Sequence, residues 1–387
     1  MNPLAGVRVL DLSRLLPGPF ATLLMSDLGA EVIKIEEPQK GDYIREFDPK
    51  IGDDSAIHHL VNRGKKSVTL DLKRDRGRAL FLELVKTADV VLESFRPGVL
   101  DRLQIGFERL RRSNRRIILC SLTGYGQSGP RQHDAGHDIN YIGYTGILAL
   151  NGTGDGIPVV PSVPIADLGG GASMAVVGML AGLLAQRTTG EAQWIDVSML
   201  DGTASWLPLV LAEYLGSGKV GQKTGVLSGG YACYTTYPTA DCRFMAVGAV
   251  EAKFWEAFCR QLGLSHLIGL QLAPPAIQNT MKEEIAAVFR QHSQSYWIQH
   301  FEGVEACCTP VLTIDEAISD PQLQARGMFT QHTGVPAIGL PLHWVDQSPC
   351  PLVTAAPYLG EHTAEILGQL GISPAQLEAL RQEKIIR

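Results

Sequence analysis

The sequence lacks several features that mark large classes of proteins. Its 387 residues include no basic tail and no long basic run, and Lys and Arg (34) are fewer than Asp and Glu (40). The resulting net charge of -6 argues against a protein that binds nucleic acid through phosphate contacts. The densest basic cluster, Arg111-Arg112 with Arg115-Arg116, is interpreted as the solvated end of a helix.

Long apolar runs are also scarce. The longest stretch, Met174 to Ala185, is interrupted by Gly178 and Gly182 and is shorter than the ~18 residues that a membrane span needs. The opening residues Leu4 to Asp11 do not form a charged leader followed by an apolar run. We therefore expect no secretory signal and no membrane partner.

Cysteine shows no pairing pattern. The seven cysteines are an odd number, and no C-x-x-C pair occurs among them. They are Cys120, Cys233, Cys242, Cys259, Cys307, Cys308 and Cys350. This distribution favours reduced thiols in a cytoplasmic protein over a disulfide framework or a zinc site, and we expect no bound metal.

The first 130 residues alternate between strand and helix patterns. Short apolar runs predict strands at 7–12, 32–35, 68–72, 89–93 and 117–120. Apolar or amphipathic segments between them predict helices, among them 20–28 and 76–87. Strand, helix and strand at this spacing indicate an α/β fold with a parallel, Rossmann-like sheet and helices on its faces.

The alternation is lost between Pro130 and Pro164, where Gly, Asp, Asn and Tyr are frequent. Long irregular segments inside a compact enzyme are usually functional. Beyond them, the pattern predicts helices at 167–186 and 199–215, and then a polar, glycine-rich connector at 219–230. The change in composition at the connector predicts a smaller second domain.

One glycine motif resembles a nucleotide-binding fingerprint and is set aside. Gly124 to Gly129 fits G-x-G-x-x-G and follows a predicted strand, but Pro130 and a segment without helical periodicity come next. A dinucleotide site needs a helix to begin at this point, so that its N-terminus faces the pyrophosphate. We interpret the motif as a tight turn near a site.

Three polar residues are candidates for a catalytic role. His137 lies between glycine and aspartate in the irregular segment, Asp167 begins a glycine-rich helix, and Glu251 follows a predicted strand. Each also has a purely structural explanation: a turn residue, a helix N-cap, and a carboxylate that pairs with a helix dipole. Spacing alone leaves both interpretations open.

Many separate motifs occur in the order typical of one known family. They are Leu4–Ser13, Pro17–Phe20, Asp27–Glu36, Asn62–Ser67, Phe95–Gly98 and Leu122–Gly126. On these motifs the chain resembles the class III CoA-transferase superfamily (CaiB/BaiF type) over nearly its whole length. The segment Gly136–Tyr141, followed by Asp167 and Glu251, is similar to the α-methylacyl-CoA racemase branch.

The resemblance implies both a fold and an assembly. It predicts a large α/β CoA-binding domain over residues 1–215, a smaller α+β domain over 216–330, and a C-terminal segment, 331–387, that returns to the large domain. Family members look like interlocked homodimers with the site between the large domain of one chain and the small domain of its partner. We therefore expect a homodimer.

For the catalytic residues, the resemblance implies a two-base racemase acting on 2-methylacyl-CoA thioesters. His137 and Asp167 would serve opposite faces of the α-carbon, and Glu251 would hold the His137 ring. Backbone N–H groups near Asp138 would stabilise the enolate oxygen. Coenzyme A enters as part of the substrate, so we expect no separate cofactor.

The CoA moiety needs cations for its phosphates, and the resemblance places a set of residues near it. These predicted CoA-binding residues are Arg14, Leu16, Lys34, Asn62, Arg63, Lys66, Glu93, Arg96 and Tyr125. Several follow predicted strands, and ligands of α/β sheets gather at the carboxyl ends of strands.

Two other functions compete with the racemase. In a CoA-transferase, Asp167 would form an acyl anhydride, but the glycine run that closes over this intermediate in many transferases is reduced here to Ser228-Gly229-Gly230. A non-catalytic acyl-CoA-binding or scaffold protein would leave three acid-base groups without a purpose. The racemase is therefore our leading hypothesis.

Overall fold

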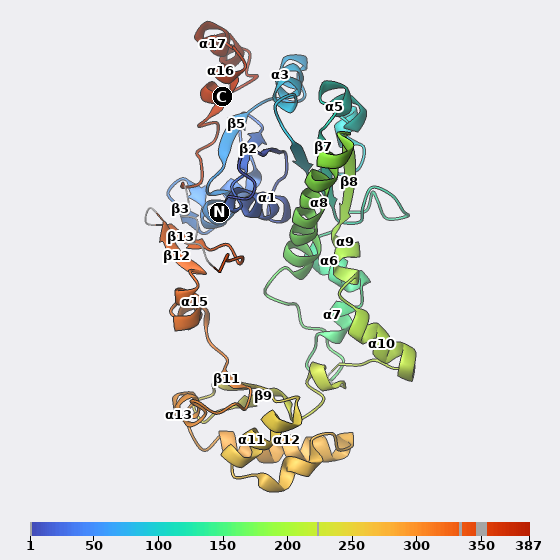
Figure 1. Cartoon of the computed structure of the whole chain (residues 1–387), viewed down its shortest axis with the longest axis vertical. Helices are drawn as coiled ribbons and strands as arrows, with labels where there is room; N and C mark the ends of the chain where they lie inside the picture. The colour runs from blue at the N-terminus through green and yellow to red at the C-terminus, as the bar shows by residue number, and fades with distance from the viewer. Residues whose placement is uncertain (1, 223, 333–334, 346–353) are drawn as a thin grey trace. The chain divides into compact units, whose positions relative to one another are not determined.

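The computed structural model describes residues 2–222, 224–332, 335–345 and 354–387, so that Cys350 lies outside the described residues. The chain divides into two compact units (Figure 1). The first unit comprises Met1–Thr145, Ser162–Trp206 and Pro321–Arg387, and the second comprises Gly146–Pro161 and Leu207–Asp320. The longer segment of the second unit, Leu207–Asp320, begins and ends about ten residues before the limits of 216 and 330 predicted from the sequence. The second unit also includes the short segment Gly146–Pro161.

The first unit is built on a six-stranded parallel sheet in the order β5-β2-β1-β6-β7-β8. The strands are β1 (Arg8–Asp11), β2 (Glu31–Glu36), β5 (Lys66–Thr69), β6 (Val90–Glu93), β7 (Ile118–Thr123) and β8 (Gln193–Ser198). In register, Leu10 of β1 lies opposite Ile33 of β2 and Val91 of β6. The predicted parallel α/β sheet is confirmed, although β5 ends at Thr69 rather than at residue 72.

Helices cover both faces of this sheet. The helices of the whole unit are α1 (Pro17–Asp27), α2 (Ala56–Asn62), α3 (Asp75–Val85), α4 (Val99–Arg102), α5 (Phe107–Ser113), α6 (Asp138–Tyr144), the π-helix η2 (Ala166–Ser173), α8 (Met174–Thr189), α9 (Met199–Ala204), α15 (Pro321–Ala325), α16 (Thr363–Gln369) and α17 (Pro374–Gln382). A 3-10 turn, η1 (Tyr43–Glu46), and the short pairs β3 (Lys50–Ile51) with β4 (Asp54–Ser55) and β12 (Phe329–His332) with β13 (Val335–Ile338) complete the unit.

Alternation along the strands divides the core into two layers. Leu10 and Ile33 belong to the apolar cluster formed with α3, α5, α16 and α17. The neighbouring residue Asp11 points to the opposite face, where it contacts Thr22 of α1. The C-terminal segment is part of this unit, since the backbone N–H of Asp71 donates to the carbonyl of Ile385 near the end of the chain.

The π-helix η2 continues directly into α8. The combined helix is longer than the apolar segment that was expected from the sequence. Together they form a 24-residue segment, Ala166–Thr189, that is long and apolar enough to cross a membrane by length and composition alone. The expectation that no segment reaches this length is wrong, because the helix begins eight residues before Met174. In the fold, α8 lies along β7 and β8 (Figure 1), and Gly178 and Gly182 bring its backbone close to Ile195 of the sheet. A core helix of a soluble protein passes the same length and composition test.

The second unit contains a three-stranded antiparallel sheet, β11-β10-β9, with helices packed against it. Its elements are α7 (Ile147–Leu150), α10 (Pro208–Ser217), η3 (Val226–Ser228), β9 (Tyr234–Pro238), β10 (Phe244–Gly248), α11 (Ala252–Gln261), η4 (Ser265–Leu270), α12 (Pro275–Phe289), α13 (Gln294–His300), β11 (Cys308–Pro310) and α14 (Ile314–Ile318). Aromatic residues fill its core, where Tyr237 stacks on Phe289 with ring centroids 5.4 Å apart. The helix predicted over 199–215 is divided into α9 and α10, and Pro208 begins the second of the two.

Candidate active site

A cavity of about 430 Å³ lies in the first unit, and most of the residues that line it follow the carboxyl ends of the strands. Arg14 follows β1, Arg96 follows β6, Tyr125 follows β7 and Met199 follows β8. His137 and Asp167, the two predicted proton-transfer residues, line the same cavity. The carboxyl edge of a parallel sheet is where α/β enzymes commonly bind ligands.

The start of helix α6 positions His137. The sequence pattern predicted only an irregular segment here. His137 is the N-cap residue of α6, and its backbone N–H donates to Oδ1 of Asn140 at 3.0 Å. Tyr141, one turn into α6, donates its hydroxyl to the carbonyl of Gly136 at 2.6 Å. These bonds fix the backbone on both sides of His137 without using the imidazole ring.

Asp167 lies in the first turn of the π-helix η2, largely removed from solvent. The pKa of this carboxyl is raised to about 6, chiefly by burial and next by the charge of Asp138, while His137 opposes the shift. A carboxyl with a pKa close to neutrality can accept a proton and return it at cellular pH. The structure thus gives Asp167 the acid-base character that the two-base hypothesis needs.

The glycines after Asp167 allow the π-helix to pack tightly against α9. A β-carbon on Gly170 would lie 2.2 Å from Oγ1 of Thr203, and one on Gly202 would lie 1.9 Å from the carbonyl oxygen of Gly170. Side chains at these positions would separate the two helices. The glycine run is therefore a packing requirement that holds the Asp167 helix against the end of β8.

The side chain of Asp138 has a role that the sequence did not indicate. Its Oδ1 accepts hydrogen bonds from the backbone N–H groups of Ala166, at 2.6 Å, and Asp167, at 2.9 Å. From the resemblance, Asp138 was expected to contribute to the site through backbone N–H groups near it. No spacing rule connects residue 138 to residues 166 and 167, so a contact between them was not predictable from local patterns.

A second cavity, of about 610 Å³, lies at the ends of β1, β2 and β5 in the same unit. It shares Arg14, Tyr43 and Phe95 with the cavity that holds His137 and Asp167. The guanidinium of Arg14 lies 5.3 Å from the centre of the Phe95 ring. The shared residues make a continuous lining from the acid-base groups to the edge of β5.

Of the predicted CoA-binding residues, Arg14, Arg96 and Tyr125 line the cavity that contains the acid-base groups. Leu16 stands immediately before α1 and lines neither of these two cavities. Arg14 and Arg96 are exposed, so their charges are available to a ligand.

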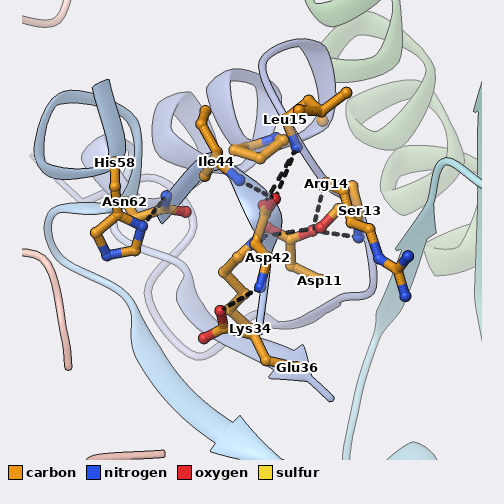
Figure 2. A network of polar contacts seen from close by, with 12 residues as sticks. Asp11, Ser13, Arg14, Leu15, Lys34, Glu36, Asp42, Ile44, His58 and Asn62 are labelled. Atoms are coloured by element: carbon orange, nitrogen blue, oxygen red, sulfur yellow. Dashed lines mark hydrogen bonds and ion pairs between the residues drawn. The ribbon is translucent and has the colours of Figure 1, made fainter. Parts of the chain in front are cut away.

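The other predicted CoA-binding cations have partners inside the protein. Lys34 is 1% exposed and forms an ion pair with Asp42 at 3.0 Å, in a group of carboxylates that Figure 2 shows in close view. Arg63 forms a bidentate pair with Asp27, and Lys66 pairs with Glu31 and Glu365. All three side chains are held in ion pairs and line neither of the two cavities, so their predicted contact with CoA stays a prediction.

Two uncharged or acidic members of the predicted set are also internal. Asn62 is fully buried and accepts a hydrogen bond from Nζ of Lys65 at 2.9 Å. Glu93 is 2% exposed and accepts the backbone N–H of Phe95 at 2.7 Å. Burial raises the pKa of Glu93 to about 7. Glu93 thus orients the turn that carries Phe95 and Arg96 rather than lining a cavity itself.

Glu251 belongs to the second unit, where it is the exposed N-cap residue of α11. Its predicted contact with His137, which belongs to the first unit, stays a prediction.

The match to a known family decides the identity of the chain. The model of CoA-transferase family III matches residues 4–363. The chain belongs to CoA-transferase family III. The family predicted from the sequence motifs is therefore confirmed.

Relatives of this family III chain include both isomerases and transferases. It is 38% identical to the human alpha-methylacyl-CoA racemase over 99% of this chain and 97% of the relative. It is 34% identical to the mouse succinyl-CoA:glutarate CoA-transferase over 96% of this chain and 87% of that protein. Among solved structures, a CAIB/BAIF family protein from Brucella suis matches with a TM-score of 0.85 and 30% identity, covering 95% of this chain and 99% of the other. The family III chain is therefore an enzyme.

Proposed function

We propose that this family III enzyme interconverts (R)- and (S)-2-methylacyl-CoA thioesters. The observation that carries the proposal is the presence of His137 and Asp167 in one cavity, with the pKa of Asp167 raised to about 6. Identities of 38% and 37% to the human and mouse alpha-methylacyl-CoA racemases support the same reaction.

The reaction balances with two proton carriers. The carboxylate of Asp167 removes the α-proton from one face of the substrate, and the electron pair of the C–H bond forms the enolate. The protonated ring of His137 then returns a proton to the opposite face. No electrons are gained or lost, so this proposal needs no redox cofactor.

The enolate and the imidazolium both need support. The backbone N–H groups in the first turn of α6, at Asp138, are suited to hold the enolate oxygen, because the first amides of a helix have no acceptors within it. Glu251 would hold the His137 ring and favour its charged form. Both roles are parts of this proposal.

The CoA moiety is proposed to occupy the two adjoining cavities. Arg14 and Arg96 are the exposed cations among their lining residues that best suit its phosphates, since guanidinium groups bind phosphate through paired hydrogen bonds.

Changing Arg96 to Gln is expected to raise KM for the acyl-CoA about 10- to 100-fold while kcat changes little, because a charge-assisted hydrogen bond contributes roughly 1.5–3 kcal/mol to binding. Steady-state kinetics at two salt concentrations measure this effect. Arg102→Gln, which removes an exposed arginine of α4 outside both cavities, is the control. An unchanged KM for Arg96→Gln would remove Arg96 from the CoA site.

A CoA-transferase is the second candidate, and the 34–35% identity to two transferases favours it. In that reaction the Asp167 carboxylate attacks the thioester carbonyl, CoA leaves as a thiolate, and an acyl anhydride remains on the enzyme. Both reactions use Asp167, whereas only the racemase needs an acid-base group at His137.

A variant of His137 therefore separates the two functions. In heavy water, the unmodified enzyme is expected to incorporate deuterium at the α-carbon of (S)-2-methylacyl-CoA and to scramble its configuration. His137→Ala is expected to lose this racemisation by about 100-fold or more, the scale of general acid-base catalysis. Mass spectrometry and chiral chromatography follow the two events.

The matched control is His133→Ala, which removes an exposed histidine from the same segment but outside the cavity. If the unmodified enzyme shows no exchange but moves CoA to an added carboxylic acid, and His137→Ala keeps that transfer, the racemase proposal is wrong and the transferase takes its place.

We further propose that the enzyme is a homodimer. Every residue of α10 is exposed or partly exposed in the single chain, although the helix is mainly apolar. The exposed fractions of Leu209, Tyr214 and Leu215 are 59%, 55% and 75%. A contiguous apolar surface of this kind is typical of an interface between subunits.

A further inference from the structure

The carboxylate of Asp138 joins the two elements that carry the acid-base groups. Asp138 is the first residue of α6 and follows His137 directly. Its Oδ1 accepts the N–H groups of Ala166 and Asp167, which begin the π-helix η2. Because the first amides of a helix have no acceptors within the helix, this one oxygen satisfies two donors that the helix itself leaves without acceptors.

The same carboxylate is also a charge beside Asp167. The groups that act electrostatically on Asp167 are Asp138, which raises its pKa, and His137, which lowers it, in addition to the larger effect of burial. Tyr141 of α6 also faces Asp167, but burial and the nearby carboxylates raise its pKa far above the physiological range, so that it stays neutral. Asp138 therefore affects both the place and the protonation of Asp167.

We propose that Asp138 is a positioning residue for proton transfer: through its carboxylate it fixes the start of the Asp167 helix against the His137 helix and supplies the negative charge that keeps Asp167 ready to hold a proton. This inference rests on the proposed function and assigns a side-chain role in addition to the backbone N–H role of residue 138. Proton transfer depends steeply on such placement, since small displacements of a reacting group cost about 100-fold in rate.

Two substitutions separate the two parts of this role. Asp138→Asn keeps an oxygen acceptor but removes the charge, and Asp138→Ala removes both. In Asp138→Asn the carboxyl of Asp167 is expected to titrate at lower pH, and the amides of residues 166 and 167 are expected to stay protected from hydrogen exchange. In Asp138→Ala the lower titration is expected together with faster amide exchange and a fall in kcat of about 100-fold, with KM changed much less.

The pH profile provides the activity readout. With a pKa of about 6, Asp167 is about one-tenth ionised at pH 5, so exchange of the enantiomer that it deprotonates falls on the acid side. In Asp138→Asn the ratio of the rates at pH 5 and pH 7.5 is expected to rise by up to about tenfold, the limit set by complete ionisation. Asp201→Asn, which removes an exposed carboxylate from the neighbouring helix α9, is expected to leave the ratio unchanged.

Two measurements do not depend on turnover. Carbon-13 NMR of aspartate-labelled enzyme, assigned with Asp167→Asn, gives the titration of Asp167, and hydrogen-exchange mass spectrometry reports the amides of 166 and 167. An unshifted titration in Asp138→Asn, or wild-type protection and kcat in Asp138→Ala, overturns the inference. If the unmodified enzyme itself exchanges no α-proton, the proposed function fails, and these two measurements still decide whether Asp138 controls Asp167.

Discussion

Replacing Asp167 with asparagine is expected to reduce α-proton exchange by about 1,000-fold, within the range of roughly 100- to 10,000-fold for loss of a general acid or base. The amide has nearly the shape of the carboxylate but does not accept a proton at neutral pH. The hydrogen bonds that Asp138 makes to residues 166 and 167 involve backbone N–H groups, so the helix start is expected to remain in place. Deuterium incorporation by purified Asp167→Asn measures the loss.

The same variant is expected to fail as a CoA-transferase, because the amide is a poor nucleophile toward a thioester. Asp167→Asn therefore tests what the two functions share, and His137→Ala tests what distinguishes them. Binding of the acyl-CoA, followed by calorimetry, is the control that the cavity is intact. If Asp167→Asn kept more than about a tenth of the activity in either assay, Asp167 would not be the reacting group in that reaction.

Replacing Asp11 with asparagine is expected to lower the free energy of unfolding by about 3–5 kcal/mol, the usual cost of breaking a buried ion pair. Asp11 is fully buried on the α1 side of the sheet, and its Oδ2 lies 3.3 Å from Nζ of Lys65, which is also fully buried. Burial alone would raise the pKa of Asp11, but Lys34, Lys65 and hydrogen bonds from Ser13 and Thr22 outweigh it and lower the pKa to about 2. Urea denaturation at pH 7 measures the loss.

The loss of stability in Asp11→Asn is expected to become smaller as the pH rises. Burial is the main reason that the pKa of Lys65 falls to about 7, below its ordinary value of 10.5. Between pH 7 and 10.5 the unfolded chain binds more protons at Lys65 than the folded chain does. The contribution of Lys65 to the free energy of unfolding therefore increases as the pH rises through this range. The destabilisation by Asp11→Asn is therefore expected to be larger at pH 6, where Lys65 is charged, than at pH 9.

Glu83→Gln is the matched control, since Glu83 and Lys86 form an ion pair in which both side chains are 52% exposed. Exposed pairs of this kind contribute about 0.5 kcal/mol or less. A loss at Asp11 no larger than that at Glu83, or one that is independent of pH, would mean that the buried pair does not stabilise the sheet as argued.

The local pattern of the sequence predicted the sheet well because strands that are buried on both faces carry short runs of consecutive apolar residues. The runs around Leu10, Ile33 and Val91 could be recognised without any knowledge of their neighbours. Pro17, at the first position of α1, and Gly29, which has a φ of +99° just after it, mark the ends of that helix for equally local reasons.

Local pattern was a poorer guide to charged residues. Lys34 and Arg63 are cations of the kind that bind phosphate, but Lys34 pairs with Asp42 and Arg63 pairs with Asp27. A cation pairs with whichever acid the fold brings to it, and an isolated stretch of sequence does not contain that information. Arg14 and Arg96 differ from them only in that their side chains remain exposed at the cavity.

The family and the parallel sheet could be predicted from the sequence, and His137 and Asp167 could be named as candidate acid-base residues, because motif order, apolar runs and residue chemistry are properties of neighbouring positions. The exposure of Arg14 and Arg96 at the cavity, the approach of residues 137 and 167 to one cavity, and the raised pKa of Asp167 all depend on the fold. The physical reason is that burial and charge pairing depend on contacts through space, such as the one from Asp138 to the backbone of residues 166 and 167.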